Sequence, residues 1–272
     1  MIPTHSPFDL MATTYDADFA ESATGRAQRR RVWKYLTPLL NAAGRPLQIL
    51  EINCGTGEDA IQLASLGHQV IATDASQAMI EKARDKSLQI GDKTAVPEFR
   101  RCAFERLIPS FEGKEFDLVV SNFGGLNCID PISLRSLAKD LYSLTNKNGR
   151  LFLVVMGTCC IREILHYCMR GKFKTAFRRF NKSVNFNVKG FSIRVFYYSP
   201  RTLSTLFNSS FQLQKKYPVG IFLPPTYLEE KYLKLPKKLT RLEKLENSLG
   251  HPIFSGLADH YCAIFNKTES QA

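Results

Sequence analysis

The sequence lacks an apolar run as long as a membrane-spanning helix, which needs about 18 residues. Its longest candidate, Leu151–Met156, has the length of a strand. The first ten residues also lack a basic segment followed by an apolar one, the pattern of a secretory signal. From these two absences we expect a cytoplasmic protein without a transmembrane segment.

The seven cysteines show neither the spacing of a disulfide framework nor that of a zinc site. No two of them form a Cys-x-x-Cys motif, and Cys159 and Cys160 are adjacent, which is a poor geometry for chelating one metal ion. We therefore expect reduced, mostly buried thiols and no metal site.

Acidic residues are absent from one long stretch. The 65 residues between Glu163 and Glu229 contain no Asp or Glu but 11 Lys or Arg, so they supply nearly all of the formal net charge of +12. The same stretch holds 14 aromatic residues, and in places such as Lys172–Lys174 and Phe177–Phe180 rings and cations alternate. The positive charge is thus a local feature.

Apolar strand-like segments alternate with helical ones along most of the chain, a pattern typical of a parallel sheet covered on both faces. A first helix is predicted over Gly25–Asn41, with Arg26, Arg29, Arg30 and Arg31 mostly on a solvated face. The predicted strands are Leu47–Ile52, His68–Thr73, Val96–Ala103, Phe116–Ser121, Leu151–Met156, Phe211–Phe222 and His260–Phe265. We predict an α/β fold with a doubly wound, seven-stranded, mostly parallel sheet whose last strand is antiparallel.

The pattern changes after Gly157, where a helix, a basic aromatic piece and two alternating runs interrupt the series. We therefore expect an inserted α+β element after the fifth strand. The predicted parts are an N-terminal lid and helix (1–45), a cofactor-binding core (46–157), an inserted acceptor-side element (158–199) and a C-terminal part with a helical insert that completes the core (200–272).

A glycine turn at Gly55-Thr56-Gly57 follows the first strand and precedes a helix, a place where backbone N–H groups bind ligands. The turn also fits Gly-x-Gly-x-x-Ala, a loose sequence pattern of dinucleotide-binding loops. However, the carboxylate of Glu51 at the strand end disfavours a bound pyrophosphate, because like charges about 4 Å apart repel by roughly 1 kcal/mol even in water. S-adenosylmethionine carries a cationic sulfonium and amino group and no phosphate. Glu51 therefore favours S-adenosylmethionine over NAD or FAD.

Asp74, which follows the second predicted strand, and Met79, which lies in the next predicted helix, each allow two interpretations. Asp74 is placed to accept hydrogen bonds from both ribose hydroxyls of a cofactor, or it only caps the following helix. Met79 packs on the adenine face, or it belongs only to the helix core.

The segments Ile49–Ala60 and Val70–Met79 resemble the first two motifs of class I S-adenosylmethionine-dependent methyltransferases, and Phe116–Asn122 and Asn148–Leu153 resemble the later motifs. Tyr15-Asp16 and Gly25-Arg26 resemble the N-terminal lid of the small-molecule, type 11-like branch. The resemblance implies a Rossmann-like methyltransferase fold and S-adenosylmethionine as cofactor. It implies these cofactor-binding residues: Tyr15, Arg26, Glu51, Asn53, Gly55, Thr56, Gly57, Asp74, Ala75, Met79, Ala103, Phe104 and Asn122.

The sequence departs from the family pattern at two places. Asn53 stands where the family usually has glycine, and asparagine tolerates the unusual backbone angles of such a turn. Cys102-Ala103 replaces an Asp-Ala pair whose carboxylate meets the adenine amino group, so adenine must rely on backbone groups and on packing, for which Phe104 is the candidate.

No catalytic residue is evident, since methyl transfer chiefly requires alignment of the nucleophile and exclusion of water. His166, Tyr197 and Tyr198 lie in the expected acceptor region, but packing or surface roles suit them better. For the basic stretch, the alternatives are a solvated helix face, a small anionic or lipid-like acceptor with peripheral membrane contact, and RNA. We predict that Arg178 and Arg179 are exposed charges that attract the acceptor.

RNA is the less favoured acceptor, because the chain lacks Asn-Pro-Pro-Tyr after the fourth strand and has no Pro-Cys nucleophile. A different class of function is a catalytically idle cofactor-binding module. The sequence predicts neither the acceptor's identity nor the oligomeric state.

Overall fold

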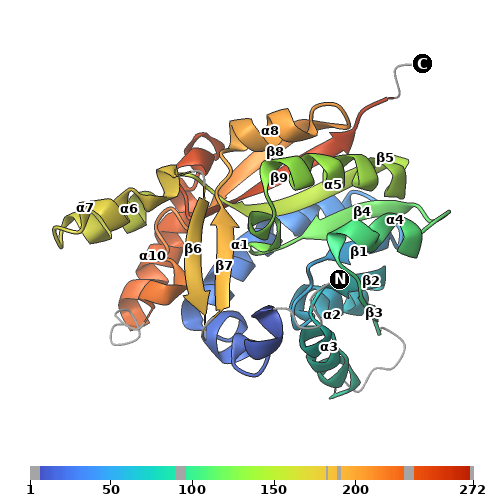
Figure 1. Ribbon diagram of the computed structural model, residues 1–272, viewed down its shortest axis with the longest axis horizontal. Helices are drawn as coiled ribbons and strands as arrows, with labels where there is room; N and C mark the ends of the chain where they lie inside the picture. The colour runs from blue at the N-terminus through green and yellow to red at the C-terminus, as the bar shows by residue number, and fades with distance from the viewer. Residues whose placement is uncertain (1–6, 90–95, 182, 189–190, 230–235, 270–272) are drawn as a thin grey trace.

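The computed structural model describes residues 7–89, 96–181, 183–188, 191–229 and 236–269. A seven-stranded sheet runs through the molecule in the order β3-β2-β1-β4-β5-β9-β8, and β9 is the strand that runs antiparallel to its neighbours (Figure 1). The strands are β1 (Gln48–Ile52), β2 (Gln69–Asp74), β3 (Glu98–Arg101), β4 (Phe116–Ser121), β5 (Thr145–Met156), β8 (Phe211–Val219) and β9 (His260–Lys267). This arrangement confirms the predicted fold class.

Helices cover both faces of the sheet because successive strand residues point to opposite sides. Ile49 belongs to the core beneath the first three helices, whereas Leu50 and Ile52 belong to the core on the other face. The longer helices are α1 (Ala23–Asn41), α2 (Glu58–Ser65), α3 (Gln77–Gln89), α5 (Pro131–Leu144), α6 (Ile161–Cys168), α8 (Pro200–Phe207) and α10 (Pro236–Leu249). The four-residue helices are α4 (Leu107–Ser110) and α7 (Phe173–Ala176).

Short-range sequence signals set several helix starts. Asp130 accepts hydrogen bonds from the N–H groups of Ile132 and Ser133 at the start of α5, and Pro131 occupies the first turn. Ser76 accepts one from the N–H of Met79 at the start of α3. Both starts follow from residue types that are visible in the sequence, since Ser and Asp are favoured N-cap residues.

Several element bounds differ from the sequence prediction: β3 and β8 are shorter than predicted and α1 begins two residues earlier, but the largest differences are at β5 and before α1. Strand β5 begins at Thr145, six residues before the predicted Leu151, because Thr145 pairs with Phe116 across a register shift. Before α1, the chain forms a 3-10 helix (Pro7–Leu10) and a π-helix (Asp16–Ala20). The sequence does not predict these two helices, because such short segments cannot show the helical spacing of apolar residues.

After β5 the chain leaves the sheet. Helices α6 and α7 and a 3-10 turn (Arg178–Phe180) extend to one side, and strands β6 (Ser183–Val188) and β7 (Phe191–Phe196) form a separate hairpin (Figure 1). The sequence predicts a turn at Lys189-Gly190 between the two alternating runs, but these two residues lie outside the described ones. Among the described helices, none is both long and apolar enough to cross a bilayer.

Candidate cofactor site

The glycine turn after β1 has three residues with left-handed backbone angles, which glycine and asparagine tolerate better than other residues. Asn53, Gly55 and Gly57 all have positive φ angles, of 54°, 54° and 79°. A Cβ on Gly57 would lie 2.8 Å from the Phe99 ring, so only glycine fits there. Asn53 adopts the left-handed conformation that asparagine tolerates, as the sequence predicted.

Asn53 also joins the turn to the end of β4. Its Nδ2 donates a hydrogen bond to the carbonyl oxygen of Asn122 at 2.8 Å, and its Oδ1 accepts one from the Ser121 hydroxyl at 2.6 Å. A glycine at this position could make neither bond. The side chain thus holds the carboxyl ends of β1 and β4 together.

Glu51 is a buried carboxyl group beside this turn, 2% exposed. Its Oε2 has no hydrogen-bond partner among the described residues. Burial, together with the nearby Asp59 and Asp74, raises the pKa of Glu51 well above its usual value, although Arg29 opposes the shift. A buried carboxyl oxygen without a partner is costly to the fold, so it marks a place suited to a donor from a ligand.

Asp74 ends β2 on the other side of the turn. Its Oδ2 accepts a hydrogen bond from the Gly55 N–H at 3.0 Å and its Oδ1 accepts one from the Ser76 N–H at 2.9 Å. Burial raises its pKa despite these bonds. Ser76, and not Asp74, caps α3, so Asp74 orders the glycine turn and keeps further lone pairs for a ligand.

The N-terminal segment lies over the turn. The Tyr15 ring faces Gly55, since a Cβ on that glycine would stand 3.6 Å from Tyr15 Cε1, and burial around its hydroxyl raises the pKa of Tyr15 to about 12. Asp16 accepts a hydrogen bond from the Thr56 hydroxyl at 2.5 Å and pairs with Lys86 at 3.1 Å. Asp16 is not among the cofactor-binding residues predicted from the sequence. Its position next to Tyr15 is the feature of the sequence that could have indicated it.

Arg26 does not reach this group of residues. It is exposed, and its guanidinium donates to the carbonyl oxygen of Glu21. Arg29, one turn further along α1, lies there instead: it pairs with Asp59 and stacks on the Phe123 ring with its Cζ 5.4 Å from the centroid. The prediction that Arg29 faces solvent is wrong, because helix α1 packs with that side against the end of β4.

Asp59 links these elements. This buried carboxylate accepts hydrogen bonds from Trp33 Nε1 at 2.8 Å and from Asn122 Nδ2 at 2.7 Å, besides its pair with Arg29. Burial alone would raise its pKa, but Arg29 and the two donors outweigh burial and lower it. Asp59 therefore carries a charge that its neighbours already satisfy, unlike Glu51.

The remaining predicted residues follow strands β2 and β3 in the chain and differ in how far they are buried. Ala75 is exposed, Met79 is fully buried in α3, and Ala103 and Phe104 are half-buried after β3. Ala103 follows Cys102, whose N–H donates to the carbonyl oxygen of Asp74. The structure thus brings together the predicted residues Tyr15, Glu51, Asn53, Gly55, Thr56, Gly57, Asp74 and Asn122.

The sheet edge continues from Phe123 to His260 at the start of β9. Their rings meet edge to face with centroids 5.6 Å apart, and His260 Nδ1 lies 3.2 Å from Asp259 Oδ2. The three residues considered earlier have other surroundings: His166 contacts Arg170, Tyr197 lies under Arg179, and Tyr198 donates to the carbonyl oxygen of Ile129. These contacts indicate structural roles for the two tyrosines.

Arg178 and Arg179 contradict their prediction as exposed charges. Arg179 is buried and pairs with Glu163 at 2.7 Å and with Asp259 at 2.6 Å, while the partly buried Arg178 pairs with Glu163 at 2.6 Å. Their carboxylate partners, Glu163 and Asp259, lie outside the acid-free stretch, and Asp259 is 80 residues from Arg179. The composition of the stretch alone therefore does not indicate these ion pairs.

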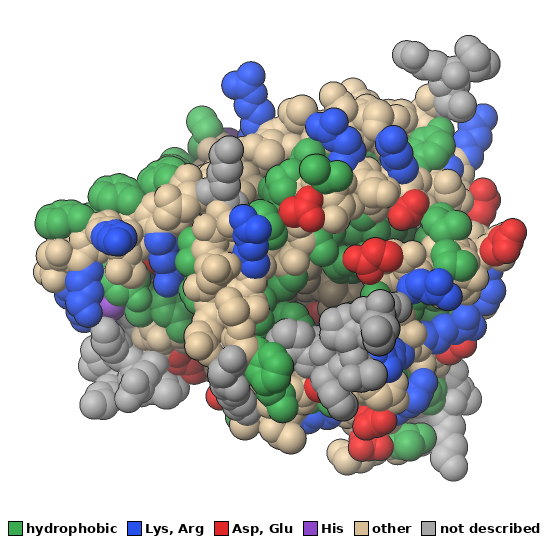
Figure 2. Space-filling model, viewed as in Figure 1, with side chains coloured by type: hydrophobic (Ala, Val, Ile, Leu, Met, Phe, Trp, Pro, Cys, Tyr) green, Lys and Arg blue, Asp and Glu red, His purple; other side chains and the backbone are tan. Residues whose placement is uncertain are grey.

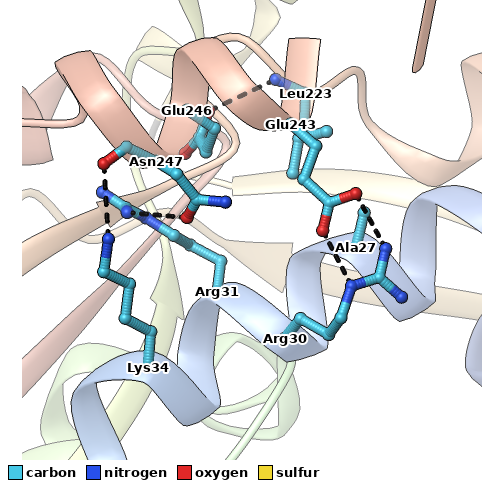
Figure 3. A pocket seen from close by; sticks show the side chains of 8 residues that line it. All are labelled: Ala27, Arg30, Arg31, Lys34, Leu223, Glu243, Glu246 and Asn247. Carbon is cyan, nitrogen blue, oxygen red and sulfur yellow. Dashed lines mark hydrogen bonds and ion pairs between the residues drawn. The ribbon is translucent and has the colours of Figure 1, made fainter. Parts of the chain in front are cut away.

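A separate cavity of about 290 Å³ lies between α1 and α10 (Figure 3). Its polar lining is already paired: Arg30 makes two hydrogen bonds to Glu243, and Arg31 donates to the carbonyl oxygen of Gly250. Both arginines were predicted to face solvent; Arg31 is in fact buried. Within the described residues, no group of three or more His, Cys, Asp or Glu side chains is placed to hold a metal ion.

Comparison with known proteins places this site in a family. Residues 49–149 match the family described as a methyltransferase domain. The tRNA 5-carboxymethoxyuridine methyltransferase of Escherichia coli K12 is 26% identical over 167 residues, and demethylmenaquinone methyltransferase of Mycobacterium sp. strain KMS is 26% identical over 156 residues. The matches cover 61% and 56% of this chain and 61% and 59% of those relatives, so the chain spans about three fifths of their length.

Solved structures with the same fold align over most of the chain. A protein of Pyrococcus horikoshii OT3 superposes with a TM-score of 0.60 at 16% identity, covering 93% of this chain and 96% of that one. Magnesium protoporphyrin IX methyltransferase of Synechocystis PCC 6803, with bound SAH, gives 0.55 at 13% identity, covering 91% and 96%. Residues 49–149 thus form a methyltransferase domain, and the chain shares the fold of solved methyltransferases, which agrees with the predicted class I S-adenosylmethionine-dependent methyltransferase and its cofactor.

Proposed function

We propose that this protein binds S-adenosylmethionine at the carboxyl ends of β1, β2 and β4 and transfers its methyl group to a small anionic or lipid-like acceptor. The observation that carries the proposal is the buried Glu51 Oε2 beside the glycine turn, which has no hydrogen-bond partner in the described part of the chain. An ammonium group of a ligand would satisfy this oxygen and favour its ionised form. The residues present therefore fit the cofactor.

The other residues of the site have complementary roles in this proposal. Asp74 accepts hydrogen bonds from the two ribose hydroxyls, and Tyr15 closes over the cofactor from the N-terminal lid. Asn53, Gly55, Thr56 and Gly57 form the backbone cradle. Ala75, Met79, Ala103, Phe104 and Asn122 flank the adenine and ribose. Arg26 leaves the proposed set, and Arg29 and Asp16 join it as positioning residues.

Electrostatics supports S-adenosylmethionine over a dinucleotide. Glu51, Asp59 and Asp74 are three acidic side chains near one turn, and each of the last two acts to raise the pKa of Glu51. A pyrophosphate would add two negative charges to this group, and in a partly buried site that repulsion exceeds its value in water. A cationic ligand relieves it instead.

Bound S-adenosylmethionine supplies an electrophilic methyl group on a sulfonium. The protein's part is to hold the acceptor in line with that methyl group and to exclude water. Phe123 and His260 continue the sheet edge beyond the cofactor residues, so we place the acceptor against them. The relative named as a demethylmenaquinone methyltransferase supports a lipid-like acceptor.

RNA is the second candidate acceptor, because one relative is a tRNA methyltransferase and the stretch from 164 to 228 is basic and aromatic. A cofactor-binding module without turnover is the third alternative. A methyl-transfer assay that supplies labelled cofactor with a lipid extract, tRNA or no acceptor distinguishes the three, since the idle module labels nothing.

Calorimetry tests the cofactor assignment directly. S-adenosylmethionine and its demethylated product are expected to bind with micromolar dissociation constants, whereas NAD, NADP and FAD give no heat of binding. Tight binding of NAD would overturn the assignment, because the Glu51 environment argues against a pyrophosphate.

A further inference from the structure

The segment from α6 through the turn at Phe180, here called the arm (161–180), projects from the body of the molecule beyond the sheet (Figure 1). Its two helices pack on each other, and a chain reversal at Gly171, which has a φ of 68°, lies between them. Within the arm, Arg178 and Arg179 pair with the buried Glu163, and Arg179 also pairs with Asp259 before β9, which ties the arm to the body of the molecule.

Five large apolar side chains on the arm are exposed to solvent. Their exposed fractions are 51% for Leu165, 80% for Met169, 60% for Phe173, 46% for Phe177 and 60% for Phe180. The rings of Phe177 and Phe180 stack with centroids 6.0 Å apart. Single exposed apolar residues need no explanation, but a cluster of five on one projecting element marks an interaction surface.

Cations accompany these apolar side chains. Arg170, Lys172 and Lys174 are exposed on the arm between Met169 and Phe177. The arm's one acidic residue, Glu163, is buried and paired with the two anchoring arginines. Figure 2 shows hydrophobic and basic side chains together over the end of the molecule that α6 and α7 form. The surface is therefore apolar and positively charged.

We propose that the arm docks this protein on an anionic lipid bilayer, with Met169, Phe173 and their apolar neighbours entering the interface and Lys172 and Lys174 meeting the headgroups. Amphipathic elements with aromatic or aliphatic side chains beside lysine and arginine bind membrane surfaces through burial and electrostatic attraction together. This inference goes beyond catalysis, because docking does not depend on turnover.

The composition of the arm favours a bilayer over two other occupants. A strand of RNA is held by cations that follow many phosphates, and Arg178 and Arg179 are already committed to Glu163 and Asp259. Leu165 and Met169 also offer no flat face for base stacking. A second copy of the chain would bring the same cations together without opposing acids, and like charges repel.

Vesicle co-sedimentation with the full-length protein tests the proposal. Binding is expected to vesicles of phosphatidylcholine with about one third phosphatidylglycerol, and to be at least about tenfold weaker with phosphatidylcholine alone. Raising the salt concentration should weaken but not abolish binding, because screening acts on the charges and not on apolar burial.

Two double variants separate the two contributions. Met169→Ser with Phe173→Ser, and Lys172→Glu with Lys174→Glu, should each lower vesicle affinity by roughly tenfold or more. The matched control is Leu88→Ser with Ile132→Ser, which removes two apolar side chains, 76% and 84% exposed, from α3 and α5. The control should change vesicle affinity by less than about twofold, and all three variants should keep the wild-type thermal midpoint and cofactor affinity.

Three results would overturn docking on lipid. One is an absence of binding to anionic vesicles. Another is binding of a single-stranded oligouridine, lost in both arm variants with a steep salt dependence, while vesicles bind no better than in the control. The third is a dimer, seen by sedimentation velocity, that the arm variants dissociate without any change in vesicle binding.

Discussion

At the scale of single residues, the carboxyl group of Glu51 shows how the fold and the site impose opposite demands. An ordinary core would not leave a buried carboxyl oxygen without a donor, and the protein tolerates this one beside a turn of positive φ angles. Burial and the acidic neighbours raise the pKa of Glu51, so its ionised form destabilises the cofactor-free protein. Such a residue is expected where a ligand supplies the missing partner.

The first prediction concerns Glu51→Gln. A folded-state pKa above the unfolded value means that the stabilising contribution of the neutral carboxyl is complete at low pH and is lost as pH rises through the folded pKa. The glutamine variant should therefore have a higher thermal midpoint than the wild type near neutral pH, by about 2–4 °C per kcal/mol, and an equal one below the unfolded pKa. Thermal denaturation of the cofactor-free protein at several pH values measures this difference.

Cofactor binding should respond to the same substitution in the opposite direction. A cation beside Glu51 favours the ionised carboxylate, so binding by the wild type should release a proton and weaken as pH falls. Calorimetry in two buffers of different ionisation enthalpy should detect that proton for the wild type but not for Glu51→Gln, whose affinity should be at least about tenfold lower. Equal affinities would exclude Glu51 from the site.

At the scale of elements, the N-terminal segment joins the site through side chains and not through the sheet. Asp16 contacts Thr56 of the glycine turn and Lys82 and Lys86 of α3, while Asp9 accepts hydrogen bonds from Ser76 and Ala78. Such polar contacts hold a segment that has little core of its own, and a segment of this kind opens more easily than the sheet.

The second prediction is that Asp16→Ala loosens this lid. Asp16 is buried and satisfied by Thr56, Lys82 and Lys86, whereas Asp18 in the same short helix is exposed and serves as the matched control. Asp16→Ala should raise the cofactor dissociation constant by about tenfold, mostly through faster release, and should increase amide exchange over residues 7–22. Asp18→Ala should leave both unchanged, and the same effect from both variants would contradict the role of Asp16.

At the scale of the whole molecule, one buried ionic network joins segments far apart in the sequence. Arg179 connects Glu163 at the start of α6 to Asp259 before β9, and Gln28 of α1 donates to the other oxygen of Asp259. Burial alone would raise the pKa of Asp259, but His260 and Arg179 outweigh burial and lower it. The network thus fastens the arm and helix α1 to the same edge of the sheet.

The third prediction follows from the burial of Arg179. Arg179→Gln leaves Glu163 and Asp259 without their central partner, and breaking a buried pair from one side costs about 3–5 kcal/mol. Arg178→Gln, which removes a more exposed partner of Glu163, should cost less than half as much. Chemical denaturation gives both free energies of unfolding; a loss below about 1 kcal/mol for Arg179→Gln would show that the network contributes little.

The sequence alone determined the sheet, its order of alternation with helices and the place of the cofactor turn, because these depend on local periodicity and on glycine positions. Asn53 at a positive φ angle and the capped starts of α3 and α5 are local in the same sense. The tertiary structure decided which polar side chains meet. Helix α1 carries four nearby arginines, and only packing shows that Arg29 reaches the site while Arg26 does not. Arg179 finds Asp259 across 80 residues, a pairing that no local pattern encodes, because long-range ion pairs depend on how elements dock and not on their own periodicity.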